Sequence, residues 1–244
     1  MGIAWACTSY VKVYLNGSSL SLTKVVHNYQ PFLPNNQERM FSMCGRFYVP
    51  EKEMDEFAKL VAEVEQHLLK KYGEIYPGDT VPIITPGKDN REVHAVKWGF
   101  PQWKGNGLII NARSETAPTK PMFQAPFKKR RCIIPATGFY EWKKDVEGER
   151  TTKIKHWISI NNKLFYMAGL YWFFKDKQDE SILCPAFTIL TTAANTKMQA
   201  IHNRMPVIIS EENIEKWLFT EDINDVLPML TPPGDDETHI QETA

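Results

Sequence analysis

Eight short segments rich in β-branched and aromatic residues follow one another between residues 93 and 209 of this 244-residue chain. Gly, Pro, Asn and Asp residues separate them, which is the pattern of short strands joined by turns. The expected strands span residues 93–98, 108–111, 132–135, 139–143, 153–160, 165–172, 187–191 and 206–209. So many short strands indicate that the core of this protein is built mainly from sheet.

The helical patterns lie mostly before and after this series of strands. Pro50 is followed by Glu51 and Glu53, a good start for a helix whose N-terminal end carries partial positive charge, and Gly73 is a suitable stop. Further helices are expected at about 195–200, 211–219 and 223–230. The sequence therefore predicts a single α+β domain, with a β-rich sheet curled into a barrel-like core and helices at its periphery.

The two ends of the chain differ from this central domain, which we place at residues 44–230. Residues 1–43 mix polar and apolar residues and have no secretory signal pattern. Either they form an additional strand pair, or they are upstream sequence that is absent from the mature protein. Residues 231–244 contain two prolines and an acidic bias, which favour a flexible tail.

The net charge of the chain is zero, but the charge is unevenly distributed. Residues 44–145 hold 17 Lys and Arg against 13 Asp and Glu, whereas residues 146–244 hold 9 against 15. A polyanion would therefore meet the first of these two regions. Its densest basic run is Lys128-Lys129-Arg130-Arg131, which taken by itself is more typical of a solvated loop.

The four cysteines are widely spaced, with no C-x-x-C pair and no histidine at ligand spacing. This argues against a zinc site and a disulfide framework, and it suits a reducing cytosol. The sequence has no run of 18 apolar residues that would span a membrane. We therefore expect a cytoplasmic protein without a metal or another cofactor.

Met43-Cys44 is the most informative dipeptide in the chain. If translation begins at Met43 and that methionine is removed, Cys44 carries a free α-amine beside its thiol. The amine can condense with an aldehyde to an imine, and the thiol can then close a five-membered thiazolidine ring. An internal cysteine cannot react in this way, because its nitrogen is part of an amide. The alternative interpretation is a buried cysteine that begins a strand.

Four segments place charged or polar residues in apolar, strand-like surroundings. They are Cys44-Gly45-Arg46-Phe47, the run from Ile110 to Thr116, Phe139-Tyr140-Glu141-Trp142, and the run from Ile201 to Val207. Arginine and glutamate are rarely buried unless they are paired. These segments predict either a polar cleft or a set of buried ion pairs.

Six motifs occur here in one order and together resemble a known family. They are Met-Cys-Gly-Arg-Phe, Trp98-Gly-Phe-Pro with Trp103, Asn111-Ala-Arg-Ser-Glu-Thr, Cys132-Ile-Ile-Pro-Ala with Phe139-Tyr-Glu-Trp, Ala168-Gly-Leu-Tyr, and His202-Asn-Arg-Met-Pro-Val-Ile. The chain from Cys44 to about Leu230 resembles the SOS response-associated peptidase (SRAP) family. Its members shield abasic sites in single-stranded DNA by covalent crosslinking.

The resemblance implies an enzyme with lyase-type chemistry and a family peptidase activity that is directed at the chain itself. The implied catalytic residues are Cys44, Asn111, Glu141 and His202. The implied DNA-binding residues are Arg46, Trp98, Arg113 and Arg204. The implied partner is single-stranded DNA with abasic sites, bound by a monomer that joins the nucleoid while it holds DNA.

Two departures from the family pattern bear on these roles. The 43 residues ahead of Cys44 block the α-amine unless they are removed or never made. Ile75-Tyr76-Pro77-Gly78-Asp79 replaces the family's Tyr-Asn-x-Ala-Pro stretch.

Two other functions are consistent with the same residues. A cysteine peptidase would use Cys44 as nucleophile, His202 as base and Asn111 or Glu141 to orient it. A non-enzymatic single-strand binder would use only the basic and aromatic surface.

Overall fold

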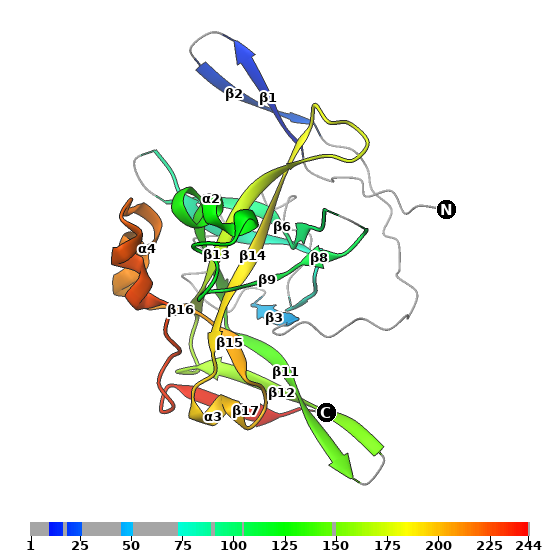
Figure 1. Cartoon of the computed structure of the whole chain (residues 1–244), viewed down its shortest axis with the longest axis vertical. Coiled ribbons are helices and arrows are strands. Elements are labelled where there is room, and N and C mark those ends of the chain that lie inside the picture. Colours follow the sequence, from blue (N-terminus) through cyan, green and yellow to red (C-terminus); the bar gives the residue numbers. More distant parts are fainter. Residues whose placement is uncertain are drawn as a thin grey trace.

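The computed structural model describes residues 10–16, 19–25, 45–50, 73–88, 91–103, 105–147 and 150–243. Five strands in it close into a barrel, because each pairs with the next and the last pairs with the first (Figure 1). In ring order they are β5 (Thr80–Pro86), β6 (Arg91–Trp98), β14 (Leu183–Ala193), β13 (Phe165–Lys175) and β10 (Arg131–Ala136). The predicted barrel-like core is confirmed.

The barrel interior is filled by apolar side chains from strands distant in sequence. Ile83, Ile134, Met167 and Phe187 are fully buried, lie on the same face of the curled sheet and come from four of its five strands. Gly169 on β13 allows this packing, because a Cβ there would lie 2.4 Å from Ile134 Cδ1 and 2.9 Å from Cys132 Sγ. The core is therefore continuous across the ring of strands.

A second sheet of five strands packs beside the barrel. Its order is β17 (Thr238–Glu242), β12 (Arg150–Ile160), β11 (Gly138–Glu147), β3 (Arg46–Val49) and β4 (Gly73–Ile75). Phe47, Phe139 and Ile158 are opposite one another on neighbouring strands and are all fully or almost fully buried. Because side chains alternate along a strand, Arg46 and Tyr140 lie on the other face of this sheet.

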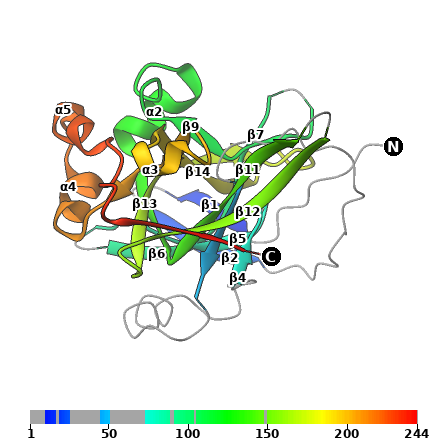
Figure 2. The ribbon, with the colours of Figure 1, turned by 90° about the horizontal axis from the view of Figure 1, so that it is seen from below.

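Short strands and helices complete the domain. The remaining strands are β1 (Tyr10–Asn16), β2 (Ser19–Val25), β7 (Phe100–Pro101), β8 (Leu108–Ile109), β9 (Asn111–Arg113), β15 (Arg204–Pro206) and β16 (Ile208–Ile209). The helices are α2 (Pro121–Lys129), α3 (Thr196–Gln199), α4 (Ile214–Phe219) and α5 (Ile223–Val226), with 3₁₀ turns η2 (Glu211–Asn213) and η3 (Leu227–Met229). Figure 2 shows α4 and α5 at one end of the molecule, away from β7.

The ends of the chain differ from the sequence-based expectation in one place. The expected flexible tail at residues 231–244 instead contains β17, which pairs with β12 from Thr238 opposite Ile160 to Glu242 opposite His156. Asn195 Nδ2 also donates to the oxygens of Pro233 and Thr238. This prediction was wrong because both contacts join residues far apart in sequence, which local composition does not report.

The N-terminal segment contains a strand pair, one of the two alternatives stated for it. Strands β1 and β2 form an antiparallel hairpin, and β1 joins the edge of β14 where Val11 is opposite Leu183. The helix expected at about 50–72 and Cys44 itself lie outside the described residues. Helix α2 was not predicted, because it contains Pro126 and proline is disfavoured inside helices.

Candidate functional site

Strand β14 brings together predicted site residues that are about ninety positions apart in sequence. On one side, β9 runs parallel to it, with Asn111 opposite Ile189 and Arg113 opposite Thr191. On the other side, β15 runs antiparallel, with Arg204 opposite Ala193. The last residues of β14 therefore lie between two arginine-bearing strands (Figure 1).

Arg204 is buried and already bound by protein groups. Its Nη1 and Nη2 form a two-pronged ion pair with the carboxylate of Glu115, with Nη2 2.8 Å from Oε2, and Nη2 also lies 2.5 Å from the carbonyl oxygen of Thr191. The hydrogen bonds from Arg204 lower the pKa of Glu115, against the opposing effect of burial. A phosphate would have to replace Glu115 to reach this guanidinium.

Arg113 differs from Arg204, because its side chain is exposed. It is the last residue of β9 and precedes Glu115 by two positions. An exposed guanidinium can take a phosphate oxygen without breaking a buried ion pair. Of these two arginines, Arg113 therefore offers the more accessible positive charge.

His202 is half-buried and contacts the backbone of Arg204 with one ring nitrogen. Its Nδ1 lies 3.1 Å from the Arg204 amide nitrogen and 3.4 Å from the Arg204 carbonyl oxygen. An unprotonated Nδ1 can accept a hydrogen bond from the amide, whereas a protonated one can donate to the carbonyl. The backbone of Arg204 therefore offers Nδ1 a hydrogen-bond partner whether or not that nitrogen carries a proton.

Glu141 lies on β11 with its side chain almost completely buried, at 5% exposure. It is opposite His156 on β12, which is also buried and whose Nδ1 lies 3.0 Å from the Ile154 carbonyl oxygen. Glu141 shares a sheet face with Phe139, two residues earlier on the same strand. This places a carboxyl group at the edge of an apolar layer.

The opposite face of the same sheet carries a cluster of aromatic and charged side chains around Arg46. The Arg46 guanidinium carbon lies 4.6 Å from the centre of the Tyr76 ring and 4.8 Å from that of Trp142. Its Nη1 is 3.5 Å from Glu74 Oε2. Arg46 is therefore held between two ring faces, with a carboxylate at its edge.

Glu74 is shared between three neighbours in this cluster. Lys155 Nζ donates to its Oε1 at 2.5 Å, and the Tyr76 hydroxyl donates to its Oε2 at 2.8 Å. Burial raises the pKa of Glu74, but the hydrogen bonds from Lys155 and Tyr76 outweigh it, and the net pKa is lowered. Burial and then the charge of Glu74 raise the pKa of Tyr140 to about 12, so this phenol keeps its proton at neutral pH.

Trp98 lies in the core and not on a surface. Its indole is fully buried, with the ring centre 5.0 Å from that of Phe47 and 6.4 Å from that of Phe187, and its Nε1 donates to the Ile110 carbonyl at 3.0 Å. In this structure Trp98 packs the core. The base contact expected for it would require the surrounding side chains to move.

Sequence reasoning missed Glu74, Lys155 and Glu115 as neighbours of the predicted site residues. Glu115 belongs to the Asn111–Thr116 run, so its position was available but not its ion pair with Arg204. Lys155 meets Glu74 only because β12, β11, β3 and β4 are adjacent in one sheet. No signal in the sequence around residue 155 indicates this contact.

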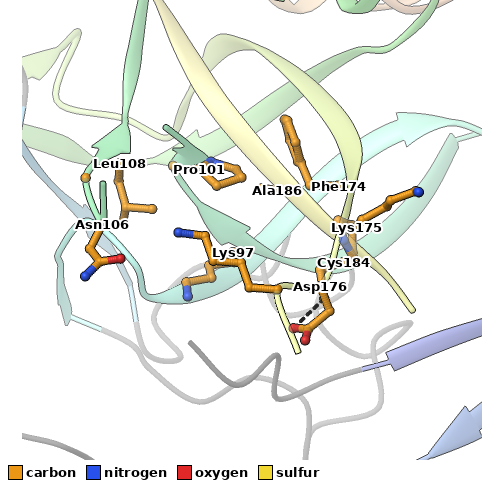
Figure 3. Close-up of a pocket in the computed structure, with 13 residues that line it drawn as sticks. Lys97, Pro101, Asn106, Leu108, Phe174, Lys175, Asp176, Cys184 and Ala186 are labelled. Atoms are coloured by element: carbon orange, nitrogen blue, oxygen red, sulfur yellow. Dashed lines mark hydrogen bonds between the residues drawn. The ribbon is translucent and has the colours of Figure 1, made fainter. Parts of the chain in front are cut away.

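A separate pocket lies between the β7–β8 hairpin and the start of β14 (Figure 3). Its walls are mainly apolar, with Pro101, Leu108 and Phe174 among them, and Lys97 and Lys175 also line it. Cys184 and Asp176 also line it, and the Cys184 Sγ lies 3.8 Å from Asp176 Oδ2. None of the predicted catalytic or DNA-binding residues that the structure describes lines this pocket.

The described part of the chain holds neither a candidate metal cluster nor a helix able to span a membrane. No group of three His, Cys, Asp or Glu side chains within residues 73–88, 91–103, 105–147 or 150–243, or in the shorter described segments, could hold a metal ion. Among the helices that the structure describes, none has the length and apolar character needed to cross a membrane.

Comparison with known proteins identifies the relatives of this chain. It is 36% identical over 207 residues to the Abasic site processing protein YoqW of Bacillus subtilis, covering 79% of this chain and 88% of YoqW. It is 30% identical over 186 residues to the Abasic site processing protein YedK of Escherichia coli, covering 73% and 81% of the two chains.

A solved protein structure from Bacteroides thetaiotaomicron has the same fold. It matches with a TM-score of 0.69 and 28% sequence identity, over 82% of this chain and 92% of that one. Residues 43–243 match the family described as SOS response associated peptidase (SRAP). The chain therefore belongs to the SRAP family.

Proposed function

We propose that this protein senses abasic sites in single-stranded DNA and binds them covalently through a thiazolidine formed by an N-terminal Cys44. The observation that carries the proposal is the position of the Met43-Cys44 pair, because the match to the SRAP family begins at residue 43. The names of the relatives, which are abasic site processing proteins, support the choice of substrate.

The proposed reaction needs only the two nucleophiles of one residue and an aldehyde. The ring-opened abasic sugar exposes an aldehyde, which the Cys44 α-amine attacks to give a carbinolamine and then, with loss of water, an imine. The thiol adds to the imine carbon and its proton passes to the nitrogen, which closes the ring. An α-amine titrates at about 7.7–8.0, so a useful fraction is neutral and nucleophilic at cellular pH.

Three of the predicted residues can assist these steps. Glu141 would transfer protons during loss of water, a task suited to a carboxyl group in partly apolar surroundings. His202 would protonate the sugar oxygen or the leaving heteroatom, and the two backbone groups near its Nδ1 accommodate both of its charge states. Asn111 would hold the sugar through hydrogen bonds without titrating.

The cationic groups would hold the DNA backbone on either side of the lesion. Arg113 is the exposed candidate, and Arg46 is separated from Cys44 by a single residue. Covalent geometry limits the distance between the Cα atoms of Cys44 and Arg46 to about 7 Å. Arg46 is therefore within reach of a phosphate next to a sugar that is bound to Cys44.

The same family supports a second candidate activity, cleavage of the chain itself just before Cys44. The 43 residues that precede Cys44 are the observation that favours it, because they must be absent before the α-amine can react. Trimming of Met43 by methionine aminopeptidase, after translation from Met43, would expose the same amine.

We expect that only protein with a free Cys44 α-amine forms a heat-stable adduct with abasic single-stranded DNA. Protein beginning at Cys44 should give the adduct on a denaturing gel. Protein whose Cys44 amine is acetylated should not, since a blocked nitrogen cannot form the imine. Intact mass of each preparation, and of the protein purified from its host, fixes the N-terminus. An adduct formed by the intact 244-residue chain, with its mass unchanged apart from the DNA, would contradict the proposal.

We expect that His202→Ala slows release of DNA more than formation of the crosslink. Opening either the sugar or the thiazolidine requires protonation of a leaving heteroatom, and histidine suits this near neutral pH. The measurement is a chase of preformed crosslink with excess competitor abasic DNA. His94→Ala, at an exposed histidine on β6, is the matched control. Equal release rates for the wild type and His202→Ala would leave His202 with a structural role only.

A further inference from the structure

The carboxylate of Glu74 neutralises the two cationic side chains that lie beside the start of β3. It accepts from Lys155 Nζ at 2.5 Å and lies 3.5 Å from Arg46 Nη1, while the Tyr76 hydroxyl donates to it at 2.8 Å. Two positive charges therefore share one negative charge. Without the carboxylate, this sheet face would present two cations with no carboxylate partner among the described residues, and one of them, Arg46, is two residues after Cys44 in sequence.

The three charged side chains are partly open to solvent. The side-chain exposures are 35% for Arg46, 23% for Lys155 and 26% for Glu74. Such a cluster is shielded enough for charges to interact strongly but is not closed to an incoming anion. Solvent, and with it a dissolved anion, can therefore reach all three charged groups.

Arg46 and Lys155 are also held in place independently of Glu74. Arg46 stacks between the rings of Tyr76 and Trp142, and Lys155 Nζ lies 4.1 Å from the centre of the Tyr140 ring. These contacts keep both cations on the same face of the sheet after the carboxylate leaves. A phosphate oxygen offers the same kind of charged acceptor as a carboxylate, and both arginine and lysine bind it.

We propose that Glu74 is a specificity-determining residue, which competes with DNA phosphates for Arg46 and Lys155. It lowers the affinity for the backbone of undamaged single strands, so that selection of the lesion depends on the covalent reaction. This inference rests on the proposed function, because it requires a DNA strand to pass beside Cys44. The carboxylate thus suppresses unproductive binding along intact DNA.

The test compares Glu74→Gln with the wild type in binding an undamaged single-stranded oligonucleotide over a range of salt concentrations. Glutamine keeps the size of the side chain and removes its charge. We expect an affinity about threefold to tenfold higher at low salt, and a log–log salt slope steeper by about 0.7 for each phosphate gained. Glu215→Gln is the matched control, because Glu215 pairs with Arg91 at 2.5 Å in another exposed ion pair and should have no effect.

Lys155→Met separates competition from a purely structural role of Glu74. In the wild-type background it should change the affinity for DNA less than about twofold. There Lys155 is a partner of the Glu74 carboxylate as well as of the phosphate, so its removal takes a cation from both. In the Glu74→Gln background it should abolish most of the gain, since there Lys155 has only the phosphate to bind. Lys155→Met also remains informative if Glu74→Gln fails to fold, because a larger loss in the wild-type background contradicts competition.

The effect of Glu74 on crosslinking can be measured with the same wild-type and Glu74→Gln proteins. Crosslinking of abasic DNA by Glu74→Gln should be inhibited more strongly by undamaged single-stranded competitor than crosslinking by the wild type. Unchanged or weaker binding of undamaged DNA by folded Glu74→Gln would overturn the inference. Failure of the wild type to form any adduct would overturn the proposed function instead, while the binding of undamaged DNA still reports on Glu74.

Discussion

Cys44→Ala is expected to abolish the covalent adduct with abasic DNA, reducing its yield by more than about a hundredfold. Alanine retains the α-amine but has no thiol, so any imine stays reversible and does not survive denaturation. The exposed Arg113 remains, and non-covalent binding to single strands should persist. Adduct is measured on denaturing gels without reductant, and binding by fluorescence anisotropy on the same samples.

Two variants make this result specific to Cys44. Cys184→Ser changes the half-buried thiol in the pocket of Figure 3 and should leave the adduct intact. Cys44→Ser keeps an α-amine and should still cleave the strand, because an imine permits β-elimination without ring closure. A heat-stable adduct from Cys44→Ala would show that the thiazolidine mechanism is wrong.

Arg131→Met is expected to lower the free energy of unfolding by about 2–4 kcal/mol. The Arg131 side chain is 3% exposed, and its guanidinium donates to four backbone carbonyls, those of Phe127, Lys128, Trp217 and Thr220. These carbonyls lie at the C-terminal ends of α2 and α4, where helices leave unsatisfied acceptors. Burial lowers the pKa of Arg131, which remains charged throughout the physiological range.

The measurement is urea unfolding at neutral pH, with Arg130→Met as the control. Arg130 precedes Arg131 in the same basic run but is exposed, with its guanidinium carbon 5.4 Å from the centre of the Phe173 ring. Loss of an exposed contact of this kind should cost no more than about 1 kcal/mol. Equal destabilisation by the two substitutions would mean that the carbonyl contacts of Arg131 contribute little.

The strands that form the barrel could be predicted because their signals are local. The run at 132–135 lies within β10 and the run at 165–172 within β13, since β-branched and aromatic residues bounded by turn residues favour strands wherever they occur. Strand β17 and helix α2 were missed for the opposite reason. The first is stabilised by pairing with β12, about eighty residues earlier, and the second contains an internal proline.

The sequence predicted which residues belong to the candidate site, but it predicted few of the contacts that those residues make. The sequence motifs selected Asn111, Arg113 and Arg204, and the two strands that carry them, β9 and β15, both pair with β14. From sequence, the basic run at 128–131 is a single unit, either a solvated loop or a contact for a polyanion. In the structure its members differ, because Arg130 is exposed while Arg131 is buried against helix ends.

The sequence by itself determined the family, the Met43-Cys44 pair and the residue types available for chemistry, because these depend only on the order of residues along the chain. Tertiary structure alone decided which of those residues are accessible. It paired Arg204 with Glu115, placed the Trp98 ring inside the core and brought Lys155 to Glu74 across four strands. Burial and charge pairing arise from segments far apart in sequence, so no local pattern could report them.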